Sequence, residues 1–258
     1  MSDTYIKYEM KATEFSELIE KYQLERMKAT TDFDTSKNVL FWLNANVLHM
    51  GNYDGSDVQD ALTLLKRAYK TEKGINCLSL SIVLCECLLA LGVRARVVYM
   101  MPKDVEDGDN HVVVEAYISE WKKWIMLDAT YGSFCEDEAG KVLNLGELQK
   151  AIQNNEKYIF SENLNYNGET DLDVDDIRDY YAKNVFFFRC KSVQGYGAHR
   201  EHGNMLEIAP DGFDVHHRMV ENLKYRIREY GSCEFFIRWL KYETELENTY
   251  VGLDDFYR

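Results

Sequence analysis

The sequence predicts an α+β fold in which a cysteine-bearing helix packs on an antiparallel sheet, with helical additions at both ends. Apolar residues recur at helical spacing up to Leu91 and follow the alternation of strands after Gly92. The 258 residues are 46% hydrophobic and 13% aromatic with only 2 prolines, a composition typical of a folded globular protein. No linker rich in proline, glycine or serine divides the sequence, so we expect one domain, with N-terminal helices at 1–34, a core at about 35–135 and C-terminal strands and helices at 136–258.

The segment before Cys77 is predicted to be helical, because its apolar residues recur every three or four positions. Side chains that cap helices, and glycines that end them, divide this segment into separate helices. The expected elements are one or two helices within residues 1–31, a helix over 38–50 capped by Thr35 or Ser36, and a third helix capped by Asp57 and ended by Gly74.

Cys77 opens an apolar run from Leu78 to Leu91, which predicts a buried helix with the cysteine in its first turn. The free N–H groups and the helix dipole at such a position stabilise negative charge, so the thiolate form of Cys77 is favoured. Because the thiolate is the nucleophilic form of cysteine, Cys77 is a candidate nucleophile.

Three antiparallel strands are predicted between residues 93 and 134. The first carries Arg96, for which we expect a salt bridge within the core rather than substrate binding. His111 begins the second strand and Asp128 ends the third, so a rigid sheet would present both side chains. A nucleophile, a base and a carboxylate that orients the base form a catalytic triad, and Cys77, His111 and Asp128 are the candidates.

The rest of the chain carries a weaker pattern, with one acidic, polar stretch that is typical of a surface loop. If its segment from Glu169 to Asp176 borders the site, its charges would attract a cationic amine; a solvated loop without a role is the alternative. The predicted elements are a helix over 144–152 capped by Asn144, a loop over 161–179, strands over 185–193 and 204–208, and helices over 214–230 and 233–250.

The candidate residues lie in four strings, which are Gly74-Ile-Asn-Cys77, Leu91-Gly-Val-Arg-Ala-Arg-Val-Val98, Asp109-Asn-His111 and Trp124-Ile-Met-Leu-Asp128-Ala-Thr130. In this order they resemble the transglutaminase-like superfamily of papain-type cysteine enzymes, over about Phe41 to Phe134. Two positions depart from that family. The glycine stands three residues before the cysteine, where many members have it two residues before, and Ala129 replaces a proline.

The resemblance implies a papain-like, transglutaminase-core fold of the bacterial type, with Cys77 as nucleophile, His111 as base and Asp128 as the group that orients it. It also implies an oxyanion donor upstream of the cysteine. Trp42 stands at a similar place, although a core role is the ordinary explanation for a tryptophan on an apolar helix. His49 is a weaker pocket candidate, whose ordinary explanation is a contact at the end of its helix.

The activity that this resemblance implies is cysteine-dependent acyl transfer on amide bonds through a thioester, without a cofactor. Water resolves the thioester in a protease or amidase and an amine resolves it in a transamidating enzyme, and the sequence does not choose between the two. The expected partners are a peptide or protein amide substrate and, for transamidation, an amine acceptor. The alternative is a catalytically inactive module that binds peptides or proteins on the same fold.

The formal net charge of −14 disfavours nucleic acid and anionic membrane surfaces as partners, because binding to phosphates depends on clustered lysines and arginines. The N-terminus lacks the apolar core of a signal peptide, and no apolar stretch approaches the ~18 residues of a membrane span. We therefore expect a cytoplasmic protein.

No disulfide or metal site is expected, and most of the six cysteines are interpreted as small buried apolar residues. Cys85 and Cys87 point in different directions on a helix, which disfavours zinc. The segment from Asn163 to Gly168 begins like a calcium loop, but Val174 stands where a glutamate is required. The histidines without partner ligands at metal spacing, expected on the surface or in loops, are His199, His202, His216 and His217.

Overall fold

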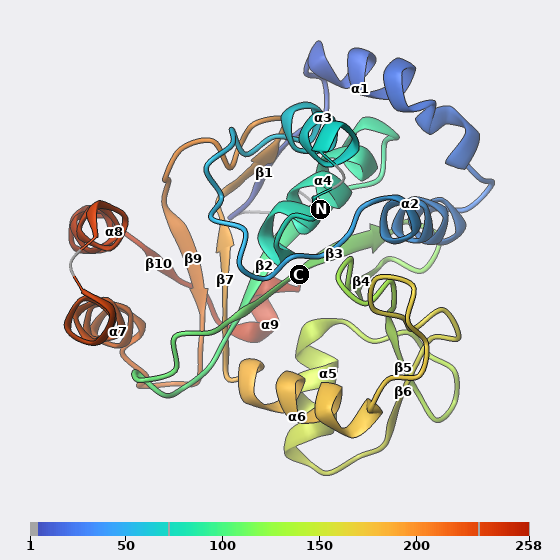
Figure 1. Cartoon of the computed structure of the whole chain (residues 1–258). Helices are drawn as coiled ribbons and strands as arrows, with labels where there is room; N and C mark the ends of the chain where they lie inside the picture. The colour runs from blue at the N-terminus through green and yellow to red at the C-terminus, as the bar shows by residue number, and fades with distance from the viewer. Residues whose placement is uncertain (1–4, 72, 232, 258) are drawn as a thin grey trace.

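The computed structural model describes residues 5–71, 73–231 and 233–257, which form an α+β fold as predicted (Figure 1). In chain order the elements are β1 (Lys7–Glu9), α1 (Glu14–Tyr22), a 3-10 helix (Leu24–Met27), α2 (Asp32–Asn46), α3 (Ala61–Thr71), α4 (Cys77–Ala90), β2 (Ala95–Met101), β3 (His111–Ile118), β4 (Lys123–Leu127), β5 (Cys135–Asp137), α5 (Leu145–Gln153), β6 (Tyr158–Phe160), α6 (Val174–Asn184), β7 (Phe187–Lys191), β8 (Val193–Gly195), β9 (Met205–Ile208), α7 (Val215–Tyr230), α8 (Glu234–Glu245), β10 (Thr249–Tyr250) and α9 (Leu253–Phe256).

A six-stranded sheet runs through the molecule in the order β10-β9-β7-β2-β3-β4. Neighbouring strands are antiparallel, except for β10 and β9, which are parallel. Strand β3 pairs with β2 on one side, where His111 lies opposite Met100, and with β4 on the other. The three predicted antiparallel strands are therefore confirmed, and β7, β9 and β10 extend the sheet beyond the β2 edge.

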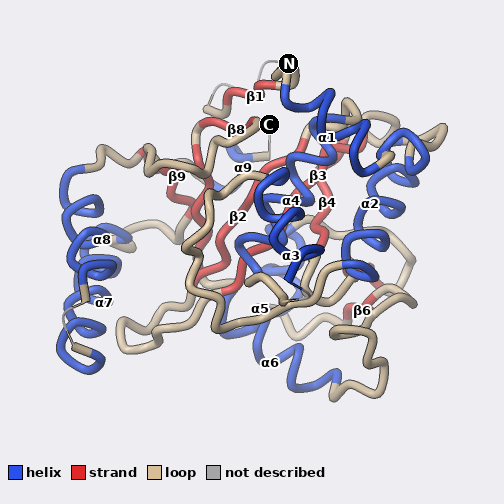
Figure 2. Tube along the Cα trace, turned by 45° about the horizontal axis from the view of Figure 1, so that its top comes forward, coloured by secondary structure: helices blue, strands red, loops and turns tan. Residues whose placement is uncertain are grey.

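Helix α4 has no polar face because protein covers it on all sides. One side packs on β2 and β3, and the helices α1, α2 and α3 pack on the others. Figure 2 shows these three helices around α4. All of its residues from Ser79 to Leu89 are buried, whereas Cys77 and Leu78 in its first turn are half-buried.

A second helical layer covers the opposite face of the sheet. Val112 and Val114 belong to the core around α4, whereas Val113 belongs to the second core, because successive side chains of a strand point to opposite faces. Leu148 of α5 and Tyr181 of α6 belong to that second core. The sheet is thus held between two layers, and residues at its edges and strand ends are the ones that can reach solvent.

Helices α7 and α8 pack on each other beside β9 and β10, on the left in Figure 1. Helix α7 contacts the sheet through Val215 and Met219, which pack against Met101 and Phe187. This helical pair stands next to the sheet rather than on one of its faces.

The first predicted cap is wrong, and the capping side chain explains the shift. Helix α2 starts earlier than predicted because Thr31, rather than Thr35 or Ser36, caps it. The Thr31 hydroxyl accepts a hydrogen bond of 3.0 Å from a backbone N–H of the first turn. The helix also ends before residues 47–50, which adopt an extended conformation next to other parts of the chain.

Two other predicted boundaries are corrected in the same way. Asp60, rather than Asp57, accepts a hydrogen bond from the Thr63 N–H, at 2.9 Å, at the start of α3. The loop predicted over 161–179 contains the first turns of α6, because the Asp173 carboxylate caps that helix. The last predicted helix ends at Glu245 and is followed by β10, and the predicted division into N-terminal, core and C-terminal parts stays a prediction.

No helix within the described ranges is both long and apolar enough to cross a membrane.

Candidate active site

Cys77 is the first residue of α4, as predicted, and neighbouring loops fix this helix start. The side-chain oxygen of Asn76 caps the helix by accepting a hydrogen bond of 3.0 Å from the Ser79 N–H. The side-chain nitrogen of Asn76 donates to the Tyr53 carbonyl at 3.1 Å. The sulfur is therefore carried on a helix end whose cap is tied to the loop that follows α2.

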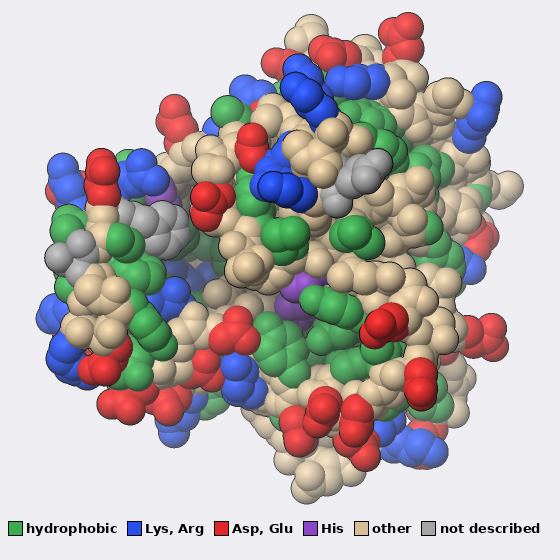
Figure 3. Space-filling view, viewed as in Figure 1, with side chains coloured by type: hydrophobic (Ala, Val, Ile, Leu, Met, Phe, Trp, Pro, Cys, Tyr) green, Lys and Arg blue, Asp and Glu red, His purple; other side chains and the backbone are tan. Residues whose placement is uncertain are grey.

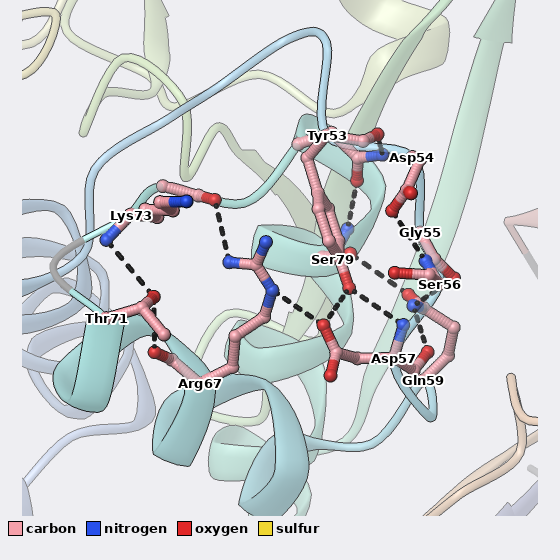
Figure 4. A network of polar contacts seen from close by, with 12 residues as sticks. Tyr53, Asp54, Gly55, Ser56, Asp57, Gln59, Arg67, Thr71, Lys73 and Ser79 are labelled. Carbon is pink, nitrogen blue, oxygen red and sulfur yellow. Dashed lines mark hydrogen bonds and ion pairs between the residues drawn. The ribbon is translucent and has the colours of Figure 1, made fainter.

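That loop is itself held by a polar network against α3 and α4 (Figure 4). The Asp57 carboxylate accepts a hydrogen bond of 3.0 Å from the Tyr53 hydroxyl and forms an ion pair of 2.6 Å with Arg67. The Gln59 side chain accepts a hydrogen bond of 3.0 Å from the Ser79 hydroxyl. Asp57 thus serves this network and not a helix cap.

Residues 48–50 run parallel to residues 74–76, and backbone hydrogen bonds of 2.9 and 3.0 Å join the two segments. Gly74 permits this close approach, since a Cβ there would lie 2.5 Å from a backbone oxygen of the neighbouring segment. The pairing brings His49 beside Cys77. The glycine three residues before the cysteine therefore has a structural reason.

His111 and Asp128 meet at the ends of two neighbouring strands, β3 and β4. The His111 Nε2 lies 2.6 Å from the Asp128 Oδ2, and these residues are 2% and 0% exposed. The carboxylate also accepts hydrogen bonds from the N–H groups of Thr130 (2.8 Å) and Tyr131 (3.3 Å) and from the Tyr181 hydroxyl (2.5 Å). Burial would raise the pKa of Asp128, but the charge of His111 and these donors lower it, so the group stays ionised.

The imidazoles of His111 and His49 lie beside the Cys77 sulfur and act on the pKa of its thiol. Since Nε2 of His111 is occupied by Asp128, its Nδ1 is the nitrogen that faces the sulfur. The Nδ1 of His49 lies 2.9 Å from the Tyr166 hydroxyl, which leaves Nε2 for the sulfur. When the Tyr166 hydroxyl donates to Nδ1, or when the ring is charged, Nε2 carries a proton and can donate to Cys77.

These contacts set the charges at the site. Burial would raise the pKa of the Cys77 thiol, but hydrogen bonds with His111 and His49, together with their charges, lower it to about 7. Burial would lower the pKa of His111, but Asp128 and the thiolate raise it to about 10. Between these values a thiolate and an imidazolium coexist, which is the activated form of a cysteine nucleophile. Burial raises the pKa of three other thiols, those of Cys85, Cys87 and Cys135.

His49 and Tyr181 contact the site in ways that the sequence did not predict. The sequence favoured a helix-end contact for His49, which is wrong because α2 ends at Asn46. Nothing local in the sequence indicates that His49 reaches the sulfur. Tyr181, the donor to Asp128, was missed altogether, although Ile177 and Tyr181 follow a capping aspartate at the four-residue spacing of an amphipathic helix.

The loop from Asn163 to Gly168 binds the site together through asparagine side chains. The Asn167 side chain accepts a hydrogen bond of 2.7 Å from the His49 N–H and donates one of 3.1 Å to the His49 carbonyl. The Asn165 side chain donates to that of Asn44 at 2.8 Å.

Within residues 5–71, 73–231 and 233–257, no group of three His, Cys, Asp or Glu side chains could hold a metal ion.

Other residues singled out in the sequence lie elsewhere. Trp42 packs with its ring 6.3 Å from that of Tyr22 and does not line either cavity at Cys77, so its oxyanion role stays a prediction without a supporting contact. The predicted Arg96 salt bridge is confirmed, with a buried 2.8 Å pair to Glu115. His199 and His202 lie in loops, as predicted, although the ring nitrogens of His199 are buried and the His202 ring stacks on an aromatic ring.

Two cavities meet at Cys77. The smaller, of about 470 Å³, lies over His111 and is lined by Tyr131, Tyr166 and Tyr180. The acidic segment 169–176 borders it through two aspartates. The larger, of about 840 Å³, lies between the α7–α8 pair and the rest of the molecule, where Figure 3 shows a hollow in the surface. A substrate at the sulfur can therefore extend in two directions.

No curated protein matches the sequence. A solved structure, of a "putative cysteine protease" from Cytophaga hutchinsonii, is similar to this chain at 23% identity with a TM-score of 0.34. The similarity covers 52% of this chain and 43% of that protein, so the chain spans less than half of its length. Residues 22–129 match the family model of the transglutaminase-like superfamily. The matched segment contains Cys77, His111 and Asp128.

Proposed function

We propose that this protein is an enzyme that opens amide bonds of a peptide or protein by acyl transfer to Cys77. The observation that carries the proposal is the arrangement at Cys77, whose sulfur lies beside the His111 imidazole while Asp128 holds that imidazole at 2.6 Å. The superfamily match supports the same chemistry. A module that only binds peptides would need neither a thiol with a lowered pKa nor an oriented imidazole.

In the first step the Cys77 thiolate attacks the amide carbonyl carbon, a C–S bond forms, and the carbonyl π electrons move to oxygen. The C–N bond then breaks, and the departing nitrogen takes the proton of the His111 imidazolium, which leaves a thioester. In the second step water or an amine gives a proton to His111 and attacks the thioester carbon, and the C–S bond breaks. The product is an acid or a new amide, and the thiolate and imidazolium are restored.

We assign stabilisation of the oxyanion to His49 and to the backbone of Cys77. The Cys77 N–H lies in the first turn of α4, where the helix offers it no carbonyl acceptor. The Nε2 of His49 lies beside the sulfur, so its N–H can donate to the oxygen of a carbonyl whose carbon is bonded to that sulfur. Donors fixed where charge develops lower the barrier to reaction. His49 thereby takes the role that the resemblance gave to Trp42.

An acceptor for the acyl group would approach over His111, in the smaller cavity. Its aromatic faces and its carboxylates suit a cationic amine, and water can enter the same space. Hydrolysis and transamidation thus use one approach, and the acceptor decides the product.

Alkylation by iodoacetamide tests the proposal, because this reagent attacks thiolates. With the pKa of Cys77 at about 7, its alkylation should rise through pH 7 and level off above it. A small reference thiol such as N-acetylcysteine, added to the same reaction, has its midpoint near the ordinary value of ~8.5. At pH 7 we expect Cys77 to react about three- to fourfold faster than this reference thiol in mass spectrometry, after allowing for the weaker nucleophilicity of a more acidic thiol.

The variant His111→Ala serves as the control for this experiment. It removes the His111 imidazole, one of the two that lower the pKa of Cys77, so the pH at the midpoint of Cys77 alkylation should rise. The variant Cys77→Ser should lose the fast-reacting site altogether. A Cys77 midpoint equal to that of the reference thiol in the wild-type protein would contradict the proposed function.

A further inference from the structure

The two cavities that meet at Cys77 differ in charge. The smaller has three carboxylates and neither lysine nor arginine among the described residues that line it. The larger has four basic side chains, in a protein whose net charge is −14. Basic side chains also border the hollow in Figure 3. The four that line the larger cavity are Arg189, Lys191, Arg226 and Arg238.

Arg189 is the one member of this set with carboxylate partners in the described part of the chain. It pairs with Glu243 at 2.6 Å and with Glu207 at 3.3 Å. Lys191 is also buried, but its ammonium donates to two backbone carbonyls and to no carboxylate that the structure describes. A buried charge without a counter-ion is costly, so an anion beside Lys191 would be stabilised.

Arg226 and Arg238 likewise line the cavity without an ion pair to any described residue. The Nε of Arg226 is buried and has no hydrogen-bond partner there. The same lining has three carboxylates: Glu243 pairs with Arg189, and Asp109, which also lines the smaller cavity, pairs with Lys183 at 3.4 Å, whereas Asp54 keeps its charge and accepts a hydrogen bond from a backbone N–H of its own loop. The positive charge of the cavity is therefore available to a ligand.

The position of His111 decides which half of a substrate enters which cavity. His111 lines the smaller cavity and not the larger. The departing amine must take its proton from His111, so the amine half of the substrate lies in the smaller cavity. The acyl half, bonded to the Cys77 sulfur, then extends the other way into the larger cavity.

Resting on the proposed acyl transfer at Cys77, we propose that the larger cavity binds a carboxylate on the acyl side of the scissile amide, through Lys191, Arg226 and Arg238. The substrate class is a peptide with aspartate or glutamate on the acyl side of the bond that is opened. Helices α7 and α8 form one wall of this cavity and lie outside the segment 22–129 that matches the superfamily. The selectivity is thus a property of the C-terminal part of the chain.

The dimensions and the rest of the lining fit a peptide. A volume of about 840 Å³ is within the range of pockets that enclose a ligand of several residues. One end carries an aromatic group in which the His202 ring stacks on Tyr242 at 4.0 Å and meets Trp239 edge-on at 4.6 Å. Flat rings of this kind pack against peptide side chains while the basic groups hold the carboxylate.

Tripeptide chloromethyl ketones test the inference, because their ketone takes the place of the scissile carbonyl and their peptide occupies the acyl side. The thiolate displaces chloride as the C–S bond forms. A set with one Glu, Gln or Lys at each position in turn isolates the charge. We expect the best Glu probe to alkylate Cys77 about tenfold faster than its Gln counterpart, the gain of a charge-assisted hydrogen bond, and the Lys probe to be slowest. The advantage should shrink at high salt.

The variants Arg226→Gln and Arg238→Gln should each reduce the advantage of the Glu probe. The matched control is Arg228→Gln on α7, whose side chain pairs with Glu229 away from the cavity, and it should keep the full advantage. Iodoacetamide has no acyl-side group, so its rate at Cys77 should be the same in all variants and reports an intact site. Equal rates for Glu and Gln probes, with iodoacetamide still selecting Cys77, would overturn the subsite alone. Loss of that selectivity in the wild-type protein would instead overturn the acyl-transfer function.

Discussion

At the scale of single residues, the sulfur of Cys77 is controlled by two imidazoles that do different work. His111 is bound to Asp128 and becomes charged, so it can pass a proton to a leaving amine. The Nδ1 of His49 lies 2.9 Å from the Tyr166 hydroxyl, which leaves its Nε2 beside the sulfur. In the proposed function His111 moves a proton and His49 donates a hydrogen bond to the oxyanion.

The variant His49→Ala should raise the pKa of the Cys77 thiol from about 7, because one of the two imidazoles that lower it is gone. Turnover of an anilide built on the preferred tripeptide should fall by about 10²–10³, the loss seen when an oxyanion donor is removed. The control Tyr166→Phe keeps the imidazole and removes only its hydroxyl partner, so both effects should be smaller. An alkylation profile that His49→Ala leaves unmoved would show that His49 does not act on the sulfur.

The triad could be predicted from the sequence because each of its members lies in a short string with its own local pattern. Cys77 opens an apolar helix, His111 opens a strand, and Asp128 ends another. His49 has no such pattern, since it acts only after residues 48–50 have paired with residues distant in the sequence. Local patterns predict elements and the residues at their ends, but they do not predict which distant segments become neighbours.

At the scale of elements, helix α6 contributes contacts to the site residues that the sheet carries. Its residue Tyr181 is buried and donates to the Asp128 carboxylate, which also accepts hydrogen bonds from the loop after β4. The preceding residue, Tyr180, donates instead to the backbone carbonyl of Asn110 at 3.3 Å. One helix thus braces both the acid of the triad and the residue before the base.

The variant Tyr181→Phe should lower the free energy of unfolding by about 1–3 kcal/mol, because buried Asp128 loses a donor. The control Tyr180→Phe, at a half-buried position, should lower it by less than about 1 kcal/mol. Urea denaturation gives both values. The pKa of Asp128 is lowered by folding, so its contribution is present above the ordinary value near ~3.9 and is lost as pH falls through the lower folded value. The difference between Tyr181→Phe and wild type should therefore shrink in acid, and a difference that persists there would mean that packing, not the hydrogen bond, is lost.

The prediction of a loop in place of the first part of α6 followed from its composition. Polar, acidic residues are typical of loops, but aspartates are also preferred where helices begin, since they accept hydrogen bonds from free N–H groups and suit the helix dipole. Asp173 does this for α6. The short strands β1, β5, β6, β8 and β10 escaped prediction for another reason, because two or three residues carry too little alternation to be recognised.

At the scale of the whole molecule, one buried ion pair joins the sheet to the end of the chain. Arg96 and Glu115 face each other across β2 and β3 at 2.8 Å, and both are 0% exposed. Arg96 also donates to the Phe256 carbonyl at 3.1 Å. Glu115 accepts hydrogen bonds from the Tyr257 hydroxyl at 2.7 Å and from the Leu145 N–H at 3.0 Å. The pair therefore holds α5 and the C-terminal residues on the same face of the sheet.

The variant Arg96→Met should lower the free energy of unfolding by about 3–5 kcal/mol, because it leaves the buried Glu115 carboxylate without its counter-ion. The matched control is Arg94→Met, which removes a half-buried arginine that lies over the Tyr117 ring at 4.0 Å, and it should cost about 1 kcal/mol or less. Urea denaturation of the two variants makes the comparison. A similar loss in the free energy of unfolding of both variants would show that the Arg96–Glu115 ion pair does not stabilise the fold more than an ordinary half-buried arginine does.

The order of the sheet shows how far sequence patterns carry at this scale. The central strands β2, β3 and β4 follow one another along the chain and pair with their sequence neighbours, so alternation and turns predicted them together. Strand β7 joins the edge of β2 from a distant part of the sequence, and this choice of partner depends on the packing of both layers. The cavity beside α7 and α8 depends on the same packing and had no counterpart in the sequence.

The groups that act on one sulfur atom come from widely separated parts of the chain. His49 stands before Cys77, while His111, Asp128, Tyr166 and Tyr181 all come after it. A chain in which one of these segments has not docked therefore lacks part of the arrangement around this cysteine. The lowered pKa of Cys77 is thus a property of the completed fold and of no single element.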